Sequence, residues 1–309
     1  MDDRDLTPYA PERSEVESTL HIDFEKNSRD PARVFRAMAL LIDAFSAIDQ
    51  DLIHSIGVAA EPIELLQDIE TGSLRAVLRT LVQSTDDEAI RNLDWKKLVG
   101  AYLLRGKQAI LRRLDDSPKV ETRDQVDAIR SDLSEIARET EVVQLPVYQP
   151  ISTKRLLASV RLLADAVGEL GEGDVASLRT PTTTTPINRE ISLSSERAEE
   201  LQTRDTITGD SVLILVIKKP DYLGTSMWEF RHGDRQLDAK ILDFKWIADF
   251  HARKISISPG DALKARVRSE VKYGHDGSIV VQRHFIIEVL EITQVLEIPQ
   301  ESLFVDDAA

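Results

Sequence analysis

The chain has 309 residues and a mass of 34.7 kDa, of which 42% are apolar and 30% charged. That balance is typical of a soluble globular protein with room for two domains. The absence of cysteine excludes disulfides, thiolate metal sites and a cysteine nucleophile. No apolar run is long enough to cross a bilayer, and the first four residues do not begin a signal peptide. We therefore predict a cytoplasmic protein without a membrane contact.

The net charge of −15 is unevenly distributed. Residues 211–290 contain 13 Lys+Arg against 10 Asp+Glu, whereas residues 1–210 contain 26 against 39. The last 19 residues add five acids and no base. An acidic body disfavours non-specific binding to nucleic acid, but the late segment alone would tolerate it.

The first elements along the chain are a strand and a long helix. Leu20, Ile22 and Phe24 alternate with polar residues, which predicts a strand with one buried face. Asp30 and Pro31 then mark the start of a helix that ends near Gly57. Its main apolar stripe consists of Val34, Phe35, Met38, Leu41, Ile42, Phe45, Ile48 and Leu52.

A second apolar row lies beside that stripe, formed by Ala37, Leu40, Ala44 and Ala47. A helix with two apolar rows is either buried on two sides or in contact with a second copy. Both interpretations stay open at this point.

Residues 63–70 and 73–80 are predicted to form a hairpin around a Thr71-Gly72 turn, with Leu65 opposite Leu78. This register creates two opposite-charge pairs, Asp68 with Arg75 and Glu64 with Arg79. A slip by one residue would place both arginines opposite apolar residues, so we expect the register with the charge pairs. The helix packed on this hairpin predicts an α+β unit.

Three more amphipathic helices are predicted, at residues 86–114, at 123–139 and after Ser152. Thr180 to Pro186 reads TPTTTTP, which is typical of an extended linker. The periodicity then changes to that of short strands, with Leu237, Ala239 and Ile241 pointing inward.

The fold class is therefore predicted as α+β: an acidic N-terminal mixed domain, formed by a β-α-β-β hairpin unit plus helices, followed by a smaller, mostly antiparallel β-domain. The expected boundaries are a tail at 1–17, the α+β domain at 18–175, a Thr/Pro-rich linker at 176–188, the β-rich domain at 189–298 and an acidic tail at 299–309.

The last hairpin of the β-domain carries a row of basic residues on one strand: Lys264, Arg266, Arg268 and Lys272. The apolar set Leu263, Ala265 and Val267 is expected to share the other face with Phe285, Ile287 and Val289. The basic row suggests either a stripe that binds backbone phosphates or a solvated sheet face balanced by nearby acids. No aromatic residues are interleaved to stack bases.

One local pattern has an enzymatic interpretation. Pro220-Asp221 follows a buried strand, and Asp238-Ala239-Lys240 lies on a later strand, which resembles the signature of the PD-(D/E)xK nuclease superfamily. The resemblance implies that Asp221 and Asp238 hold Mg²⁺ and that Lys240 orients or activates the attacking water. The inward alternation of that strand would place Asp238 and Lys240 on its solvent face.

Other catalytic signatures are absent. No two of the six histidines have the spacing of a helical metal pair, and no GxSxG elbow or glycine-rich phosphate loop occurs. We therefore assign no metal ligand and no cofactor, apart from Mg²⁺ under the nuclease interpretation.

The expected function is that of a non-enzymatic binding or adaptor protein acting through protein–protein interaction or self-association. Two alternatives remain: a Mg²⁺-dependent nuclease using Asp221, Asp238 and Lys240, and a nucleic-acid-binding β-module using Lys264, Arg266, Arg268 and Lys272.

Overall fold

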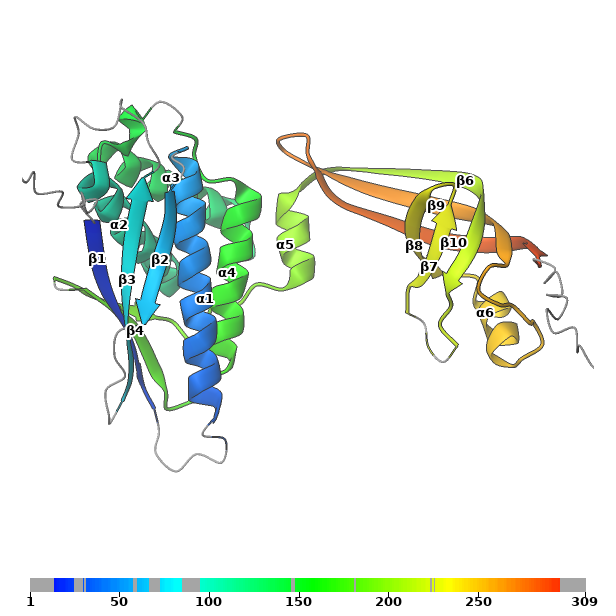
Figure 1. Cartoon of the computed structure of the whole chain (residues 1–309), viewed down its shortest axis with the longest axis horizontal. Coiled ribbons are helices and arrows are strands. Elements are labelled where there is room, and N and C mark those ends of the chain that lie inside the picture. Colours follow the sequence, from blue (N-terminus) through cyan, green and yellow to red (C-terminus); the bar gives the residue numbers. More distant parts are fainter. Residues whose placement is uncertain are drawn as a thin grey trace, which may run out of the picture. The chain divides into compact units, whose positions relative to one another are not determined.

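The computed structural model describes residues 14–24, 30, 32–57, 60–66, 73–84, 95–145, 148–180, 182–222, 224 and 226–294. The chain divides into two compact units, Met1–Leu201 and Gln202–Ala309. The first combines helices with an antiparallel sheet, and the second is built mainly of strands (Figure 1). The predicted α+β fold class is confirmed.

Unit 1 contains a five-stranded antiparallel sheet in the order β2-β3-β1-β4-β5. Its strands are β1 (Ser14–Asp23), β2 (Ala60–Leu66), β3 (Leu74–Ser84), β4 (Val175–Arg179) and β5 (Thr184–Ile187). The helices are α1 (Ala32–Ser55), α2 (Trp95–Asp116), α3 (Arg123–Glu139), α4 (Thr153–Gly168) and α5 (Ser195–Gln202), with a 3₁₀ turn η2 (Val142–Gln144). Within the described segments, no helix is long and apolar enough to span a bilayer.

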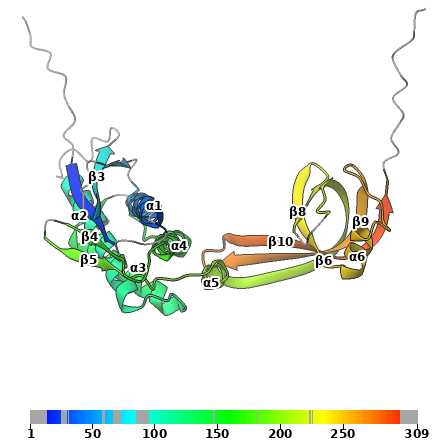
Figure 2. The same ribbon diagram turned by 90° about the horizontal axis from the view of Figure 1, so that it is seen from below.

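The second apolar row of α1 is buried inside unit 1. Ala37 and Ala44 are both 0% exposed, and Leu40 packs partly buried against the same core. Helix α4 runs beside α1 in both views (Figures 1 and 2), and its Ser159 Oγ donates to Asp51 of α1 at 2.8 Å. The alternative of burial on two sides therefore holds, and these buried alanines offer no surface to a second copy.

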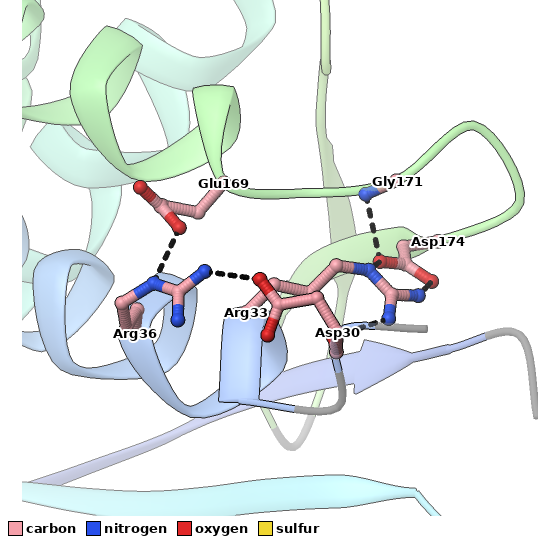
Figure 3. A network of polar contacts seen from close by, with 6 residues as sticks. All are labelled: Asp30, Arg33, Arg36, Glu169, Gly171 and Asp174. Carbon is pink, nitrogen blue, oxygen red and sulfur yellow. Dashed lines mark hydrogen bonds and ion pairs between the residues drawn. The ribbon is translucent and has the colours of Figure 1, made fainter. Parts of the chain in front are cut away.

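The start of α1 is tied to the connection between α4 and β4 by two arginines (Figure 3). Arg33 donates from Nε and Nη2 to the two carboxylate oxygens of Asp174, at 3.1 and 2.8 Å. Arg36 Nε donates to Glu169 at 2.7 Å. The Asp174 side chain is fully buried and that of Arg33 nearly so, so this bidentate pair fixes where α1 begins against the sheet.

The predicted register of the β2–β3 hairpin was wrong. Leu66 lies opposite Leu78 and Leu65 opposite Arg79, one residue away from the expected pairing. The reason is that β3 is a central strand, with Glu17 of β1 opposite Arg79 on its other side. The pairing of β3 on both sides sets the register, so cross-strand charge within the hairpin alone does not decide it. The Thr71-Gly72 turn lies outside the described residues.

The segment predicted as a linker, residues 176–188, instead belongs to the sheet of unit 1. Strand β4 pairs with β1, and β5 pairs with β4. Thr180 and Thr183 close the connection, with Thr183 N donating to Thr180 Oγ1 at 3.0 Å. Threonine is β-branched and favours strands, and Pro186 is tolerated because β5 is an edge strand. The boundary between the units lies after Leu201.

Helices α1 and α2 are joined by two buried polar contacts. Lys107 Nζ donates to Asp49 Oδ2 at 2.7 Å, with both side chains almost fully buried. Tyr102 Oη lies 3.1 Å from Ser55 Oγ. Gly106 lies between them in sequence, and a Cβ atom there would come within 2.8 Å of Leu52. The two helices therefore need both the glycine and the paired polar groups to pack this closely.

Burial raises the pKa of Tyr102 to about 12. An unfolded chain ionises tyrosine near pH 10, so the buried neutral phenol contributes stability that is complete below pH 10 and lost as the pH rises towards 12. Between pH 7 and pH 11 we expect wild type to lose about 1.4 kcal/mol more unfolding free energy than Tyr102→Phe. Urea titrations at both pH values measure this loss. The control is Tyr222→Phe, which removes an exposed hydroxyl; an equal loss in wild type and Tyr102→Phe would contradict the assignment.

Unit 2 is a closed five-stranded barrel in the order β10-β8-β7-β6-β9. Its elements are β6 (Thr203–Lys219), β7 (Trp228–His232), β8 (Arg235–Ile241), α6 (Phe244–His251), β9 (Ala262–Gly274) and β10 (Ile279–Thr293). All neighbouring strands are antiparallel except β8 and β10. This order, with a helix between the third and fourth strands, is the topology of the OB fold.

The barrel core is aromatic. Trp228 is 1% exposed, and its ring centroid lies 5.1 Å from that of Phe250 and 5.9 Å from that of Trp246. Both partners come from α6, which Asp243 caps by accepting a hydrogen bond from Trp246 N. The other oxygen of Asp243 accepts from Val289 N at 3.2 Å, so one carboxylate attaches α6 to β10.

The prediction that the apolar residues of the last hairpin share one face is confirmed only in part. Ala265 lies opposite Val289, but Phe285 lies opposite Arg268 instead of sharing the apolar face. Irregularities between Ile286 and Glu288, and again between Val289 and Glu291, each insert a residue into β10. Each bulge exchanges the two faces of the strand, and a simple alternation cannot anticipate that exchange.

Candidate functional site

Three strands of unit 2 continue beyond the barrel as a sheet that we call the arm (Figures 1 and 2). The arm comprises residues 203–210 of β6, 268–274 of β9 and 279–285 of β10, with β9 in the centre. All of residues 204–212 of β6 are exposed. A sheet normally buries one face against another layer, so an arm this exposed is unusual in a lone molecule.

One side of β6 forms a free edge, which we define as residues 204–213. Residues 205–213 pair with β9 without interruption, and Arg204 lies at an irregularity between Thr203 and Asp205. Strand β7 joins β6 only from Val216 onwards. At the end of the edge, His232 Nδ1 lies 3.0 Å from the carbonyl oxygen of Ile214 and closes it. Among the described residues, no second strand lies beside the free edge, so alternate backbone N–H and C=O groups along it face solvent.

The free edge lacks most features that protect natural edge strands. It contains no proline and no lysine, and its pairing with β9 has no bulge after Asp205. Two of its side chains are large, apolar and exposed, Ile207 at 59% and Val212 at 52%. Ile207 lies opposite Val271 of β9, so one face of the arm carries an apolar row at this level.

The opposite face of the arm and barrel carries the predicted basic row, and each member has an acidic neighbour. The pairs are Lys264–Glu291 at 3.9 Å, Arg266–Glu288 at 3.6 Å, Arg268–Asp210 at 2.8 Å and Lys272–Glu270 at 3.8 Å. The two hydrogen bonds from Arg268 lower the pKa of Asp210, which keeps that carboxylate ionised. Three of these pairs join neighbouring strands and the fourth, Lys272–Glu270, lies within β9, so the row is neutralised by ion pairs as expected of a solvated sheet face.

The three residues of the nuclease interpretation occupy different settings. Asp221 organises the β6–β7 loop, because its carboxylate accepts hydrogen bonds from Gly224 N and from Ser226 N and Oγ. Asp238 and Lys240 lie on the outer face of β8, as their spacing predicted, while Ala239 between them is buried. The described residues contain no group of three acids or histidines that could hold a metal ion. This arrangement lends the nuclease alternative no support.

His21 of β1 lies between two polar side chains, with Nε2 2.8 Å from Ser73 Oγ and Nδ1 3.5 Å from Asp23 Oδ2. These contacts have the order of a hydrolytic triad. The burial differs from that of a triad, however, because the imidazole is buried whereas the Asp23 side chain is 61% exposed. A triad acid is buried so that it can orient the imidazole and stabilise its charge. The contacts are better explained as satisfying a buried histidine.

A groove of about 240 Å³ lies between α2 and α3, lined mainly by charged side chains. Arg113 and Asp132 form an ion pair at 2.6 Å across it, and Arg105 and Glu139 form another. Ligand pockets are mostly apolar with a few convergent polar groups. This groove has paired charges instead, so its side chains serve to join two helices.

The free edge was not predicted from the sequence, because residues 203–211 do not have the composition of a strand, although β6 begins at Thr203. Residues 203–211 read TRDTITGDS, and their aspartates and glycine are typical of a loop. The available signal was the alternation of Thr206, Ile207 and Thr208, three β-branched residues that favour a strand. Comparison with protein-family models, with curated proteins and with solved structures gave no match.

Proposed function

We propose that this chain is a non-enzymatic binding protein that acts through protein–protein contact at the free edge of β6. The observation that carries the proposal is a long, regular and exposed edge strand with apolar side chains and no protecting proline or lysine. A strand from another polypeptide can extend such a sheet, with main-chain hydrogen bonds giving affinity and alternate side chains giving specificity.

A second candidate function follows from the barrel topology. OB barrels bind oligonucleotides or oligosaccharides on the face of their second and third strands, here β7 and β8. The outward side chains of these strands are Glu229, Arg231, Gln236, Asp238 and Lys240. They mix both charges and include no aromatic ring for base stacking, so binding of single-stranded nucleic acid has weaker support than strand addition.

Selection from a random peptide library tests strand addition directly. Phage-displayed dodecapeptides are selected on the full chain, and the enriched sequences are remeasured as free peptides by fluorescence anisotropy. We expect β-branched residues at alternate positions and no proline within the bound segment, because each peptide would pair as a strand. Enrichment of no sequence, or of sequences without this pattern, would count against the proposal.

Two matched variants locate the binding surface. Ile207→Lys places a charge in the apolar row at the free edge, whereas Ile279→Lys makes the same change at an exposed residue on the far strand of the arm. We expect the first to weaken peptide binding about tenfold or more and the second to leave it within about twofold. Equal affinities for both variants would show that the peptides bind elsewhere.

A further inference from the structure

We infer that the strand added to the free edge is β6 of a second copy of this chain, paired antiparallel about a two-fold axis at Ile207. The inference rests on the proposed function and names its partner. A two-fold interface presents the same patch from both subunits, so the strand must be complementary to its own reverse.

The charges of β6 select this register. With Ile207 opposite its own copy, Arg204 lies opposite Asp210 of the second copy, and Thr206 lies opposite Thr208. The two-fold axis repeats each pair, giving two opposite-charge pairs per dimer. A shift by one residue in one direction would bring Asp205 opposite Asp210, and a shift in the other direction would place Arg204 opposite Gly209 and lose both charge pairs. A centre at Asp210 would bring two copies of that acid together. Like charges directly opposite destabilise strand pairing.

The existing contacts of these charges are compatible with a further partner. Arg204 Nε donates to Asp205 at 2.7 Å, and Asp210 accepts from Arg268. An arginine has five N–H donors and a carboxylate about four acceptor positions, so both can add a bond across the interface. Both side chains are exposed, and no existing bond must break.

The apolar face of the arm also supports a two-fold axis at Ile207. Ile207 lies opposite Val271 within one copy. Pairing at Ile207 therefore produces a continuous row across four central strands, Val271 and Ile207 of one copy followed by Ile207 and Val271 of the other. Joining two three-stranded arms into one six-stranded sheet covers the free edge of β6 in both copies and leaves β10 as the outer strand on each side. Covering an exposed edge in this way limits uncontrolled edge pairing.

The later part of β6 is a less suitable position for the two-fold axis of the dimer. Val212 and Ile214 are also exposed and apolar, but the carbonyl of Ile214 is already contacted by His232, and β7 occupies the edge from Val216. A dimer centred there would have room for few backbone hydrogen bonds. The pairing segment is therefore the first half of β6.

A charge-complementation experiment tests both the dimer and its register. Arg204→Asp places acids opposite each other in a homodimer. The double variant Asp210→Arg/Arg268→Asp places arginines opposite each other, while it keeps an opposite-charge pair inside the arm. Mixing the two chains restores opposite charges at both positions of the heterodimer. The matched control is Arg235→Asp, the same charge change at the exposed first residue of β8.

Light scattering during chromatography and sedimentation equilibrium measure the assembly of the full chain. We expect wild type and Arg235→Asp to have about twice the mass of the 34.7 kDa chain. Each arm variant alone should dimerise about tenfold more weakly or worse, because two like-charge pairs form per dimer, and the mixture should regain the wild-type affinity. Circular dichroism of each chain confirms that its fold is retained.

Three outcomes would overturn the inference: a wild type that stays monomeric at high micromolar concentration, a dimer that Arg204→Asp leaves intact, or a mixture that stays monomeric. A monomeric wild type that still binds selected peptides, with that binding lost in Ile207→Lys, would overturn the second copy as partner but leave the proposed function standing. Absence of both assembly and peptide binding would overturn the two together.

Discussion

Replacing Lys107 with methionine is expected to lower the unfolding free energy of unit 1 by about 3–5 kcal/mol. The Lys107 and Asp49 side chains are only 2% and 0% exposed, and their ion pair lies between α1 and α2. Removing the ammonium leaves a carboxylate buried without its counter-charge, which costs more than the pair itself contributes. Urea unfolding followed by circular dichroism measures the loss.

Two further variants show whether the loss comes from removing the Lys107 counter-charge. Arg112→Met makes a similar change at an exposed position on α2 and should shift stability by no more than about 0.5 kcal/mol. The double variant Asp49→Leu/Lys107→Met should recover most of the loss, because apolar residues of similar volume often replace a buried pair without cost. A double variant as unstable as Lys107→Met would contradict this explanation and indicate a packing defect.

The second large effect is expected at Trp228, the central ring of the barrel. Trp228→Ala should destabilise unit 2 by about 3–5 kcal/mol, because it opens a cavity where α6 packs against the strands. Three rings lose their contact with Trp228: Phe230, Trp246 and Phe250. Differential scanning calorimetry of the full chain measures the change.

The control is the preceding residue. Met227 is 53% exposed, so Met227→Ala should leave the calorimetric transitions nearly unchanged. Because the two units have separate hydrophobic cores, we expect Trp228→Ala to lower the midpoint of one transition only. A shift below about 1 °C, or an equal shift of every transition, would contradict a barrel held together by this cluster.

The helices of unit 1 were predictable because their signals are local. The predicted span 123–139 coincides with α3, and Thr122 and Gln125 form its capping box. Ser152 caps α4 as expected. Periodicity was less reliable for single residues: Phe35 was placed in the main stripe of α1, yet it is 64% exposed while its neighbour Val34 is 3% exposed.

The sheets were harder to predict from the sequence, because paired strands are distant from each other along the chain. The register of β2 on β3 depends on β1, and the supposed linker pairs with β1 from more than 150 residues away. The candidate site was difficult to predict for the same reason. Whether β6 is an edge or a central strand follows from where β7 begins to pair, and no pattern within residues 203–211 contains that information.

The basic row shows the converse problem, since it was predicted from the residues of one strand alone. Lys264, Arg266 and Arg268 alternate correctly, but their acidic partners come from β6 and β10. A row of basic residues in the sequence is therefore a row of ion pairs in the folded sheet. Charge along a single strand is therefore weak evidence for a phosphate site until its neighbours are known.

The closure of the barrel by β10 has a consequence for how the chain folds during synthesis. Strand β8 gains its second neighbour only when residues 284–286 pair with it, and β9 likewise waits for β10. At about 5–20 residues per second, the ribosome delivers β6 several seconds before β10. Until then the nascent unit exposes β8, β9 and the free edge of β6 at once, so its risk of mispairing with neighbouring chains is greatest just before β10 is synthesised and pairs.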